Sequence, residues 1–378
     1  MKYIAFFSIL LLLVSCTDRR VSNYSLDNVP IIIDINLTKR ILLTDDHIKH
    51  IRYIPLETTD ESLIGFPNKT LIRNNRIYIG CFSVTQTLFV FDMEGNFLFR
   101  IAQRGQGPEE YISFNDFDVR PNGDIYMYDP FTKRFLIFNS EGKFQRAIQA
   151  NYFFCGFSLI GDNKMYLASL RASGRMLSAL SKYNIERNES RHLFKDRVFL
   201  QDLRISGFTM TPHHFFYSPV GIVYFSPMFS PIIYSISEIG VKPAIGVKNL
   251  TITPQRVIDS WVREENPMRR SKMMFIENRY FVENMHIFEN NTYITFVSRG
   301  GALGQTIVYN KHDEIAYEIF ALQQLIGIDR IRGSTGEDFF GVAELDIEHN
   351  AHIIEAREEL RSWQEDDNPV IVILNFNL

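Results

Sequence analysis

A short pattern recurs along the chain at an almost constant spacing, and this repeat limits the possible folds more than any other feature. Residues 91–98 read Phe-Asp-Met-Glu-Gly-Asn-Phe-Leu, and 47 residues later residues 138–145 read Phe-Asn-Ser-Glu-Gly-Lys-Phe-Gln. Each copy joins two aromatic stretches through a turn that contains Gly, which is typical of a β-hairpin. Weaker copies surround Tyr183, Tyr234 and Tyr309.

A repeat of about 45 to 50 residues that carries four short strands is the signature of β-propeller blades. The step from Tyr234 to Tyr309 is longer, and Thr253-Pro254 followed by apolar residues at helical spacing predicts a helical insertion near residues 253–275. Residues 321–378 then form a sixth unit, with a second short helix near residues 349–364. The sequence therefore predicts an all-β, six-bladed β-propeller of four-stranded antiparallel blades.

The two ends of the predicted propeller each supply one unpaired strand. Residues 50–56 precede the first full repeat, and the apolar stretch from Val370 to Phe376 ends the chain. An unpaired strand edge is a template for aggregation, so we expect these two strands to pair within one blade and close the ring.

The first sixteen residues have the features of an export signal. Lys2 precedes twelve mostly apolar residues, fewer than the roughly 20 that a spanning helix needs, and the run ends in Leu-Val-Ser-Cys. This ending resembles the bacterial lipobox, in which the cysteine, here Cys16, carries lipid. The alternative is an ordinary signal peptide with an incidental cysteine. We expect a signal peptide over 1–15, a flexible tether over 16–30 and the propeller over 31–378, anchored through lipid on Cys16 and facing the periplasm or the outer membrane.

The charge composition argues against one class of partner, nucleic acid. The chain has 40 Lys and Arg against 44 Asp and Glu, for a net charge of −4, and it lacks long basic runs. Nucleic acid is therefore not expected as a partner. The remaining cysteines, Cys81 and Cys155, lie in apolar strand-like stretches, and we expect buried thiols there rather than a disulfide.

Residues 53–147 resemble the six-bladed β-propeller lipoproteins of Bacteroides-type bacteria, which in turn are similar to NHL-repeat propellers. The resemblance rests on the Tyr-Ile-Pro-Leu-Glu-Thr-Thr stretch at 53–59, the loop at 104–111 and the Asn-Gly-Asp-Ile-Tyr strand start at 122–126. It implies the fold and an envelope location, but no activity.

The loop at residues 104–111 is the first candidate binding site. Propeller ligands usually meet loops that join the outer strand of one blade to the inner strand of the next. Arg104, Glu109 and Tyr111 would offer charges and a stacking ring there. The alternative is that the loop is structural and that Tyr111 packs between blades.

Other candidates come from histidines and from Arg residues beside Gly. His213 and Arg299 are included as binding candidates. Adjacent strand residues face opposite ways, so His213 and its neighbour His214 are poorly placed to chelate one metal. His349 and His352 fit a solvated helix better than a metal site. No metal, cofactor or catalytic residue is expected.

We expect a monomeric, non-catalytic binding module of the cell envelope that recognises a glycan, a peptide or a partner protein. Two alternatives are left open. One is a metal-dependent hydrolase or lyase with its site in the central channel, as in some NHL-like propellers. The other is a structural subunit of an envelope complex, which would carry its widest apolar patch on the rim.

Overall fold

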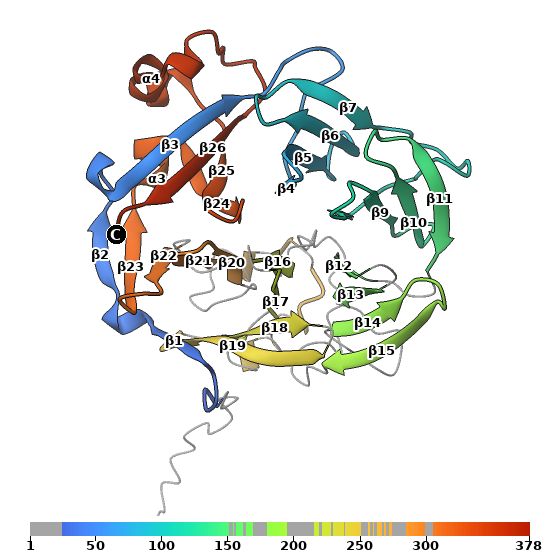
Figure 1. The fold of residues 1–378 in the computed structure, drawn as a ribbon, viewed down its shortest axis with the longest axis horizontal. Coiled ribbons are helices and arrows are strands. Elements are labelled where there is room, and N and C mark those ends of the chain that lie inside the picture. Colours follow the sequence, from blue (N-terminus) through green and yellow to red (C-terminus); the bar gives the residue numbers. More distant parts are fainter. Residues whose placement is uncertain are drawn as a thin grey trace, which may run out of the picture.

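Six antiparallel sheets form a ring around a central axis in the computed structural model (Figure 1). The structure describes residues 25–150, most of residues 154–250, parts of residues 256–273, and residues 285–298 and 305–378. The six-bladed β-propeller predicted from the repeat is confirmed.

The blades are numbered 1 to 6 in chain order, and the strands of each run from the centre of the ring outward. Blades 1 and 2 contain β4 (Lys69–Arg73), β5 (Arg76–Cys81), β6 (Thr87–Asp92) and β7 (Phe97–Ile101), then β8 (Asp116–Val119), β9 (Ile125–Asp129), β10 (Arg134–Phe138) and β11 (Phe144–Gln149). Blades 3 and 4 contain β12 (Gly156–Ile160), β13 (Lys164–Ala168), β14 (Leu180–Asn184) and β15 (Glu189–Phe194), then β16 (Phe215–Tyr217), β17 (Val223–Phe225), β18 (Ile232–Ser237) and β19 (Gly240–Lys248). Blades 5 and 6 contain β20 (Met285–Glu289), β21 (Tyr293–Ser298), β22 (Gln305–Asn310) and β23 (Ile315–Phe320), then β24 (Ile328–Ser334), β25 (Phe339–Ala343), β26 (Val370–Phe376) and β3 (Ile48–Pro55).

The repeated motif forms the turn between the third and fourth strands of a blade. The side chains of Asp92 in blade 1 and Asn139 in blade 2 each accept two backbone N–H groups of their own turn at 2.8–3.1 Å. Gly95 and Gly142 adopt positive φ angles of 91° and 75°. A Cβ on Gly95 would lie 2.1 Å from the carbonyl oxygen of Pro55, which belongs to the outer strand of blade 6. Glycine is therefore required both by the turn and by the contact with the preceding blade.

The hydrophobic core lies mostly between neighbouring blades. One cluster joins blade 1 to blade 2 through fully buried side chains such as Tyr78, Phe117 and Leu136. Comparable clusters join blades 6 and 1, 2 and 3, and 3 and 4, while a larger one spans blades 4 to 6. Each blade is thus stabilised mainly by the faces of the blades beside it.

The expected closure of the ring is present in blade 6. β26 pairs antiparallel with β3, with Val372 opposite Tyr53 and Ile371 opposite Ile54. The buried side chain of Asn368 strengthens the junction, because it donates to the carbonyl groups of Glu57 and Ser62 and accepts from the amide of Ile64. β26, the last strand of the chain, is therefore held between β25 and β3.

Two short N-terminal strands add to the blades in a way that the sequence analysis did not anticipate. β1 (Ile31–Asp34) pairs parallel with the outer strand of blade 4, and β2 (Lys39–Leu42) pairs parallel with the outer strand of blade 5. Blades 4 and 5 consequently have five strands each. The N-terminal segment runs along the outside of the ring before β3 completes blade 6 (Figure 1).

Helices occupy only connections in the described part of the chain. Those with defined bounds are α3 (Leu322–Ile326), α4 (Ile347–Ala356) and the 3₁₀ turns η1 (Ile35–Leu37), η2 (Asp45–His47) and η3 (Glu358–Leu360). Several described residues between 256 and 273 are also helical. The helix predicted near residues 349–364 is shorter than expected, because it begins at Ile347 behind the capping side chain of Asp346 and ends at Ala356. The insertion predicted near residues 253–275 lies mostly outside the described residues. No helix among the described residues has the length and apolar character needed to cross a membrane.

Candidate functional site

The first strand of blade 2 places two carboxylates toward the centre of the ring. β8 reads Asp-Phe-Asp-Val, so Asp116 and Asp118 share one face, while Phe117 and Val119 enter the core between blades 1 and 2. Both carboxylates are completely buried. Such groups require partners, because an unpaired buried charge is costly.

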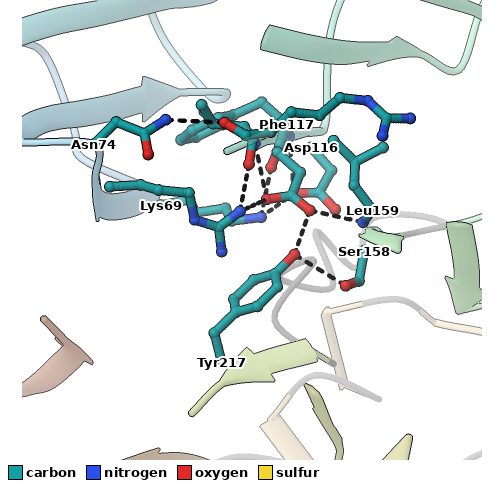
Figure 2. A network of polar contacts seen from close by, with 11 residues as sticks. Lys69, Asn74, Asp116, Phe117, Ser158, Leu159 and Tyr217 are labelled. Atoms are coloured by element: carbon teal, nitrogen blue, oxygen red, sulfur yellow. Dashed lines mark hydrogen bonds and ion pairs between the residues drawn. The ribbon is translucent and has the colours of Figure 1, made fainter. Parts of the chain in front are cut away.

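Asp116 is bound on both sides by neighbouring blades. Its Oδ1 lies 2.7 Å from Nζ of Lys69 in blade 1, and its Oδ2 accepts the amide of Phe157 in blade 3 at 2.8 Å (Figure 2). Lys69 also donates to the carbonyl group of Phe117 at 2.7 Å. One carboxylate therefore links the inner strands of three blades.

Asp118 extends this arrangement to a fourth blade. Its Oδ1 accepts from Nη1 of Arg73 at 3.1 Å, and its Oδ2 accepts the amide of Leu159 at 2.8 Å and the hydroxyl group of Tyr217. The Tyr217 hydroxyl also lies 3.0 Å from Oγ of Ser158 (Figure 2). The guanidinium group of Arg73 stacks over the Tyr217 ring at 4.2 Å. We call the set Lys69, Arg73, Asp116, Asp118 and Tyr217 the aspartate ladder.

Burial determines the protonation of two ladder groups. Loss of water raises the pKa of Asp116 to about 6, although Lys69 and the amide of Phe157 lower it in part. Burial raises the pKa of Tyr217 well above its ordinary value, and the negative charge of Asp118 adds to this rise. Tyr217 therefore stays protonated and acts as a donor to Asp118.

The raised pKa of Asp116 predicts a stability that falls as the pH rises from about 4 to about 6. Asp116 has an ordinary pKa of 3.8, so in this window the folded chain binds more protons than the unfolded chain does. A shift from 3.8 to about 6 corresponds to about 3 kcal/mol, which is fully present below pH 3.8 and lost above pH 6. The free energy of urea unfolding, measured at intervals between pH 4 and 7, should show this component in the wild type and lack it in Asp116→Asn. A component that instead grows with pH would mean that Lys69 and the amides lower the pKa of Asp116.

A pocket lies beside the ladder, between the inner strands of blades 1, 4, 5 and 6. About 440 Å³ of empty space lies within its outline, and this figure includes open solvent at the mouth. Its lining consists of Lys69, Thr70, Leu71, Phe215, Phe216, Tyr217, Phe288, Arg332, Gly333, Ser334 and Phe340. The lining thus includes five aromatic rings, two cations, two aliphatic hydroxyl groups and no carboxylate.

The loop at residues 104–111 joins β7 to β8 and is fastened by hydrogen bonds. Arg134 of blade 2 donates to the carbonyl group of Glu110 at 2.9 Å, and the carboxylate of Glu110 accepts the amide of Gly107 at 2.8 Å. Tyr111 is fully buried between blades 1 and 2 and donates to the carbonyl group of Ile101, so it offers no stacking surface. Tyr111 thus packs between blades, as in the structural alternative given for this loop.

The two remaining loop candidates do not line the pocket. Arg104 and Glu109 are exposed on the loop and are not among the residues that line the pocket. His213, Arg299 and the lipidation candidate Cys16 lie outside the described residues.

The histidines and cysteines provide no metal site in the part of the chain that the structure describes. His349 and His352 are exposed on α4, where they contact Asp346 and the carbonyl group of Gln324. Among the described residues, no group of three or more His, Cys, Asp or Glu could hold a metal ion. Cys81 is free and buried, and burial raises the pKa of its thiol to about 11, whereas Cys155 lies outside the described residues.

Sequence reasoning missed the aspartate ladder, although the repeat contains a signal for it. Lys69 and Asp116 are the first residues of consecutive inner strands and are 47 residues apart, which is one repeat. Arg73 and Asp118 are 45 residues apart. Opposite charges at equivalent positions of consecutive repeats therefore predict contacts between neighbouring blades.

Six blades, four of which are joined at the centre by the aspartate ladder, define a β-propeller with a polar and aromatic pocket between its inner strands. The chain belongs to the family described as domain of unknown function DUF4934, which matches residues 30–375. The resemblance to Bacteroides-type propellers is thus borne out for the six-bladed fold, whereas its lipoprotein and NHL-like features stay predictions.

Solved structures support the same fold. A protein of Bacteroides fragilis that is described as exported has a TM-score of 0.76 at 17% identity, with 92% of this chain and 100% of that chain covered. A member of the DUF4221 family from Bacteroides vulgatus has a TM-score of 0.54 at 12% identity, with 88% and 99% covered. At these identities the likeness extends to the fold alone. No curated protein matches the sequence.

Proposed function

We propose that this protein is a non-catalytic binding module of the cell envelope that takes its ligand into the central pocket. The observation that carries the proposal is the lining of that pocket, to which inner strands of four blades contribute cations, hydroxyl groups and aromatic rings. Such a mixture of an apolar wall with a few polar groups is typical of small-ligand sites. The ligand would be a glycan, a peptide or an exposed segment of a partner protein, and Arg104 and Glu109 would belong to the surrounding binding face.

The envelope location is supported by the N-terminal sequence and by one structural relative. The apolar run before Leu-Val-Ser-Cys has the length of an export signal, and the similar protein of Bacteroides fragilis is described as exported. We propose that lipid on Cys16 anchors the mature chain and that the residues before β1 act as a tether. Several acyl chains on one cysteine would make dissociation from the membrane negligible.

Binding without turnover gives the proposal a direct test. The purified chain is mixed with a panel of acidic and neutral oligosaccharides and short peptides, and both affinity and product formation are measured. We expect at least one member to bind with a Kd in the micromolar to millimolar range and to be recovered unchanged. In Ser334→Trp, which places a large ring in the pocket, this binding should be lost while the melting temperature stays near that of the wild type.

Two results would contradict the proposal. Cleavage of a panel member, together with a stoichiometric metal in the purified protein, would favour the hydrolase or lyase alternative. Binding that persists unchanged in a folded Ser334→Trp variant would place the ligand outside the pocket.

A further inference from the structure

We infer that the pocket recognises a carboxylate attached to an apolar or aromatic group, with Arg332 as the residue that binds the carboxylate. The inference rests on the proposed function and names the chemical class of its ligand. Three observations carry it: the balance of charge in the pocket, two buried polar atoms without partners, and the arrangement of aromatic rings.

The charge balance leaves about one positive charge in the pocket. Among the described residues, Lys69 and Arg332 are the charged side chains in the lining. The Lys69 charge is compensated by Asp116 at 2.7 Å. Arg332 has a weaker counterion, because Nη2 lies 3.5 Å from Asp329, whose side chain is 45% exposed to water. A monoanion matches this balance, whereas a doubly charged phosphate would bring excess negative charge beside partly buried groups.

Arg332 is held in place but is not saturated with hydrogen bonds. Its side chain is 10% exposed, and Nη1 donates to the carbonyl group of Pro67 at 3.1 Å. Within the described part of the chain, its buried Nε has no hydrogen-bond partner. A buried donor without a partner is destabilising, and an acceptor from a ligand would offset that cost. The planar guanidinium group suits a carboxylate, which can accept two N–H groups at once.

Thr70 supplies a second unsatisfied atom in the same pocket. Its side chain is 7% exposed, and its hydroxyl oxygen has no hydrogen-bond partner among the described residues. A hydroxyl group can donate to a carboxylate or to a neighbouring ligand oxygen. Thr70 and Arg332 both line the pocket, so a ligand that pairs with both of these atoms would satisfy them together.

The rest of the lining favours an apolar or aromatic body next to the carboxylate. Blade 4 contributes three consecutive aromatic side chains, while blades 5 and 6 contribute one each: Phe215, Phe216, Tyr217, Phe288 and Phe340. Aromatic walls bind flat apolar surfaces, including the faces of sugar rings. The carboxylate could therefore come from the end of a peptide or from an acidic sugar.

Two matched pairs of probes test the inference and distinguish these sources. N-acetyl-L-phenylalanine is compared with its amide, and phenyl β-D-glucuronide with phenyl β-D-glucoside, each by isothermal titration calorimetry on the purified full chain. At least one acid should bind roughly tenfold or more tightly than its neutral partner, because a charge-assisted hydrogen bond contributes more than a neutral one. Preference for the first acid indicates a peptide end, and preference for the second an acidic sugar.

Three variants assign the effect to the pocket. Arg332→Gln should weaken binding of the preferred acid about tenfold or more and leave the neutral partner unchanged. Thr70→Val, which keeps the shape of the side chain, should weaken the acid severalfold. Arg146→Gln removes the same charge from the outer strand of blade 2 and should have no effect.

The outcomes separate this inference from the proposed function. If acid and neutral probes bind equally and Ser334→Trp blocks both, the pocket is a binding site but the carboxylate class is wrong. Unchanged binding of the acid in folded Arg332→Gln and Thr70→Val variants would also overturn the inference. If none of the four probes binds at about 1 mM, the inference is also overturned. The proposed function is tested separately, by its own panel of ligands.

Discussion

Deletion of residues 370–378 is expected to abolish cooperative folding of the whole propeller. This segment contains β26, in which Val370, Ile371, Val372, Leu374 and Phe376 are at most 1% exposed. Burial of each such side chain contributes about 1.5–3 kcal/mol, so their combined loss is comparable with the entire stability of about 5–15 kcal/mol that is usual for a folded protein. The deletion would also leave β3 and β25 with unpaired edges. The near-ultraviolet circular dichroism signal and the thermal unfolding transition should both disappear.

A chain that begins at residue 29 is the matched control for this deletion. It lacks more residues than the C-terminal variant but retains every strand of the ring. We expect it to unfold cooperatively within a few degrees of the wild type. If the chain without residues 370–378 instead kept a cooperative transition at a similar temperature, closure of blade 6 would not stabilise the propeller.

Asp118→Ala should lower the free energy of unfolding by about 3–5 kcal/mol, which is the usual effect of removing one partner from a buried ion pair. The substitution would leave the guanidinium group of Arg73 without its counterion and the amide of Leu159 without its acceptor. It would also release the hydroxyl group of Tyr217. Because these three partners belong to blades 1, 3 and 4, the loss should affect the whole ring rather than blade 2 alone. Urea unfolding at pH 7 measures the change.

Two further variants separate the ladder from general effects of removing a carboxylate. Tyr217→Phe removes one of the hydrogen bonds to Asp118 and should cost about 1–2 kcal/mol. Asp366→Ala removes an exposed carboxylate from the loop before β26 and should change the stability by less than about 0.5 kcal/mol. A loss below about 1 kcal/mol for Asp118→Ala would show that the ladder does not stabilise the ring.

The repeat was sufficient to predict the fold because each blade carries its own local signals. The hairpin turns need Gly at positive φ and an Asp or Asn that accepts the turn amides, and these residues are visible in the sequence. The closing strand was also visible, because Val370–Phe376 is a continuous apolar run at the chain end. β1 and β2 gave no comparable signal, since each has only four residues and pairs with a strand some two hundred or more residues away.

The site was less predictable because it depends on contacts between blades. A strand that reads Asp-Phe-Asp-Val has the alternation of a half-exposed strand, and nothing local shows that its polar face is completely buried. Only the closed ring places Arg73, Asp118 and Tyr217 in one network. The loop residues were chosen by analogy with other propellers, and the structure places Tyr111 in the core instead.

The N-terminal strands constrain the order in which the protein can reach its native state. β1 pairs with Ile245–Lys248, and β2 pairs with Tyr317–Phe320. β3 pairs with β26, which is formed by the last residues of the chain. The segment that is synthesised first is thus completed by partners that are synthesised much later. Contacts of such long sequence separation form slowly, and blade 6 cannot close before Val370–Phe376 is present, so the native ring assembles only once the whole propeller has been synthesised.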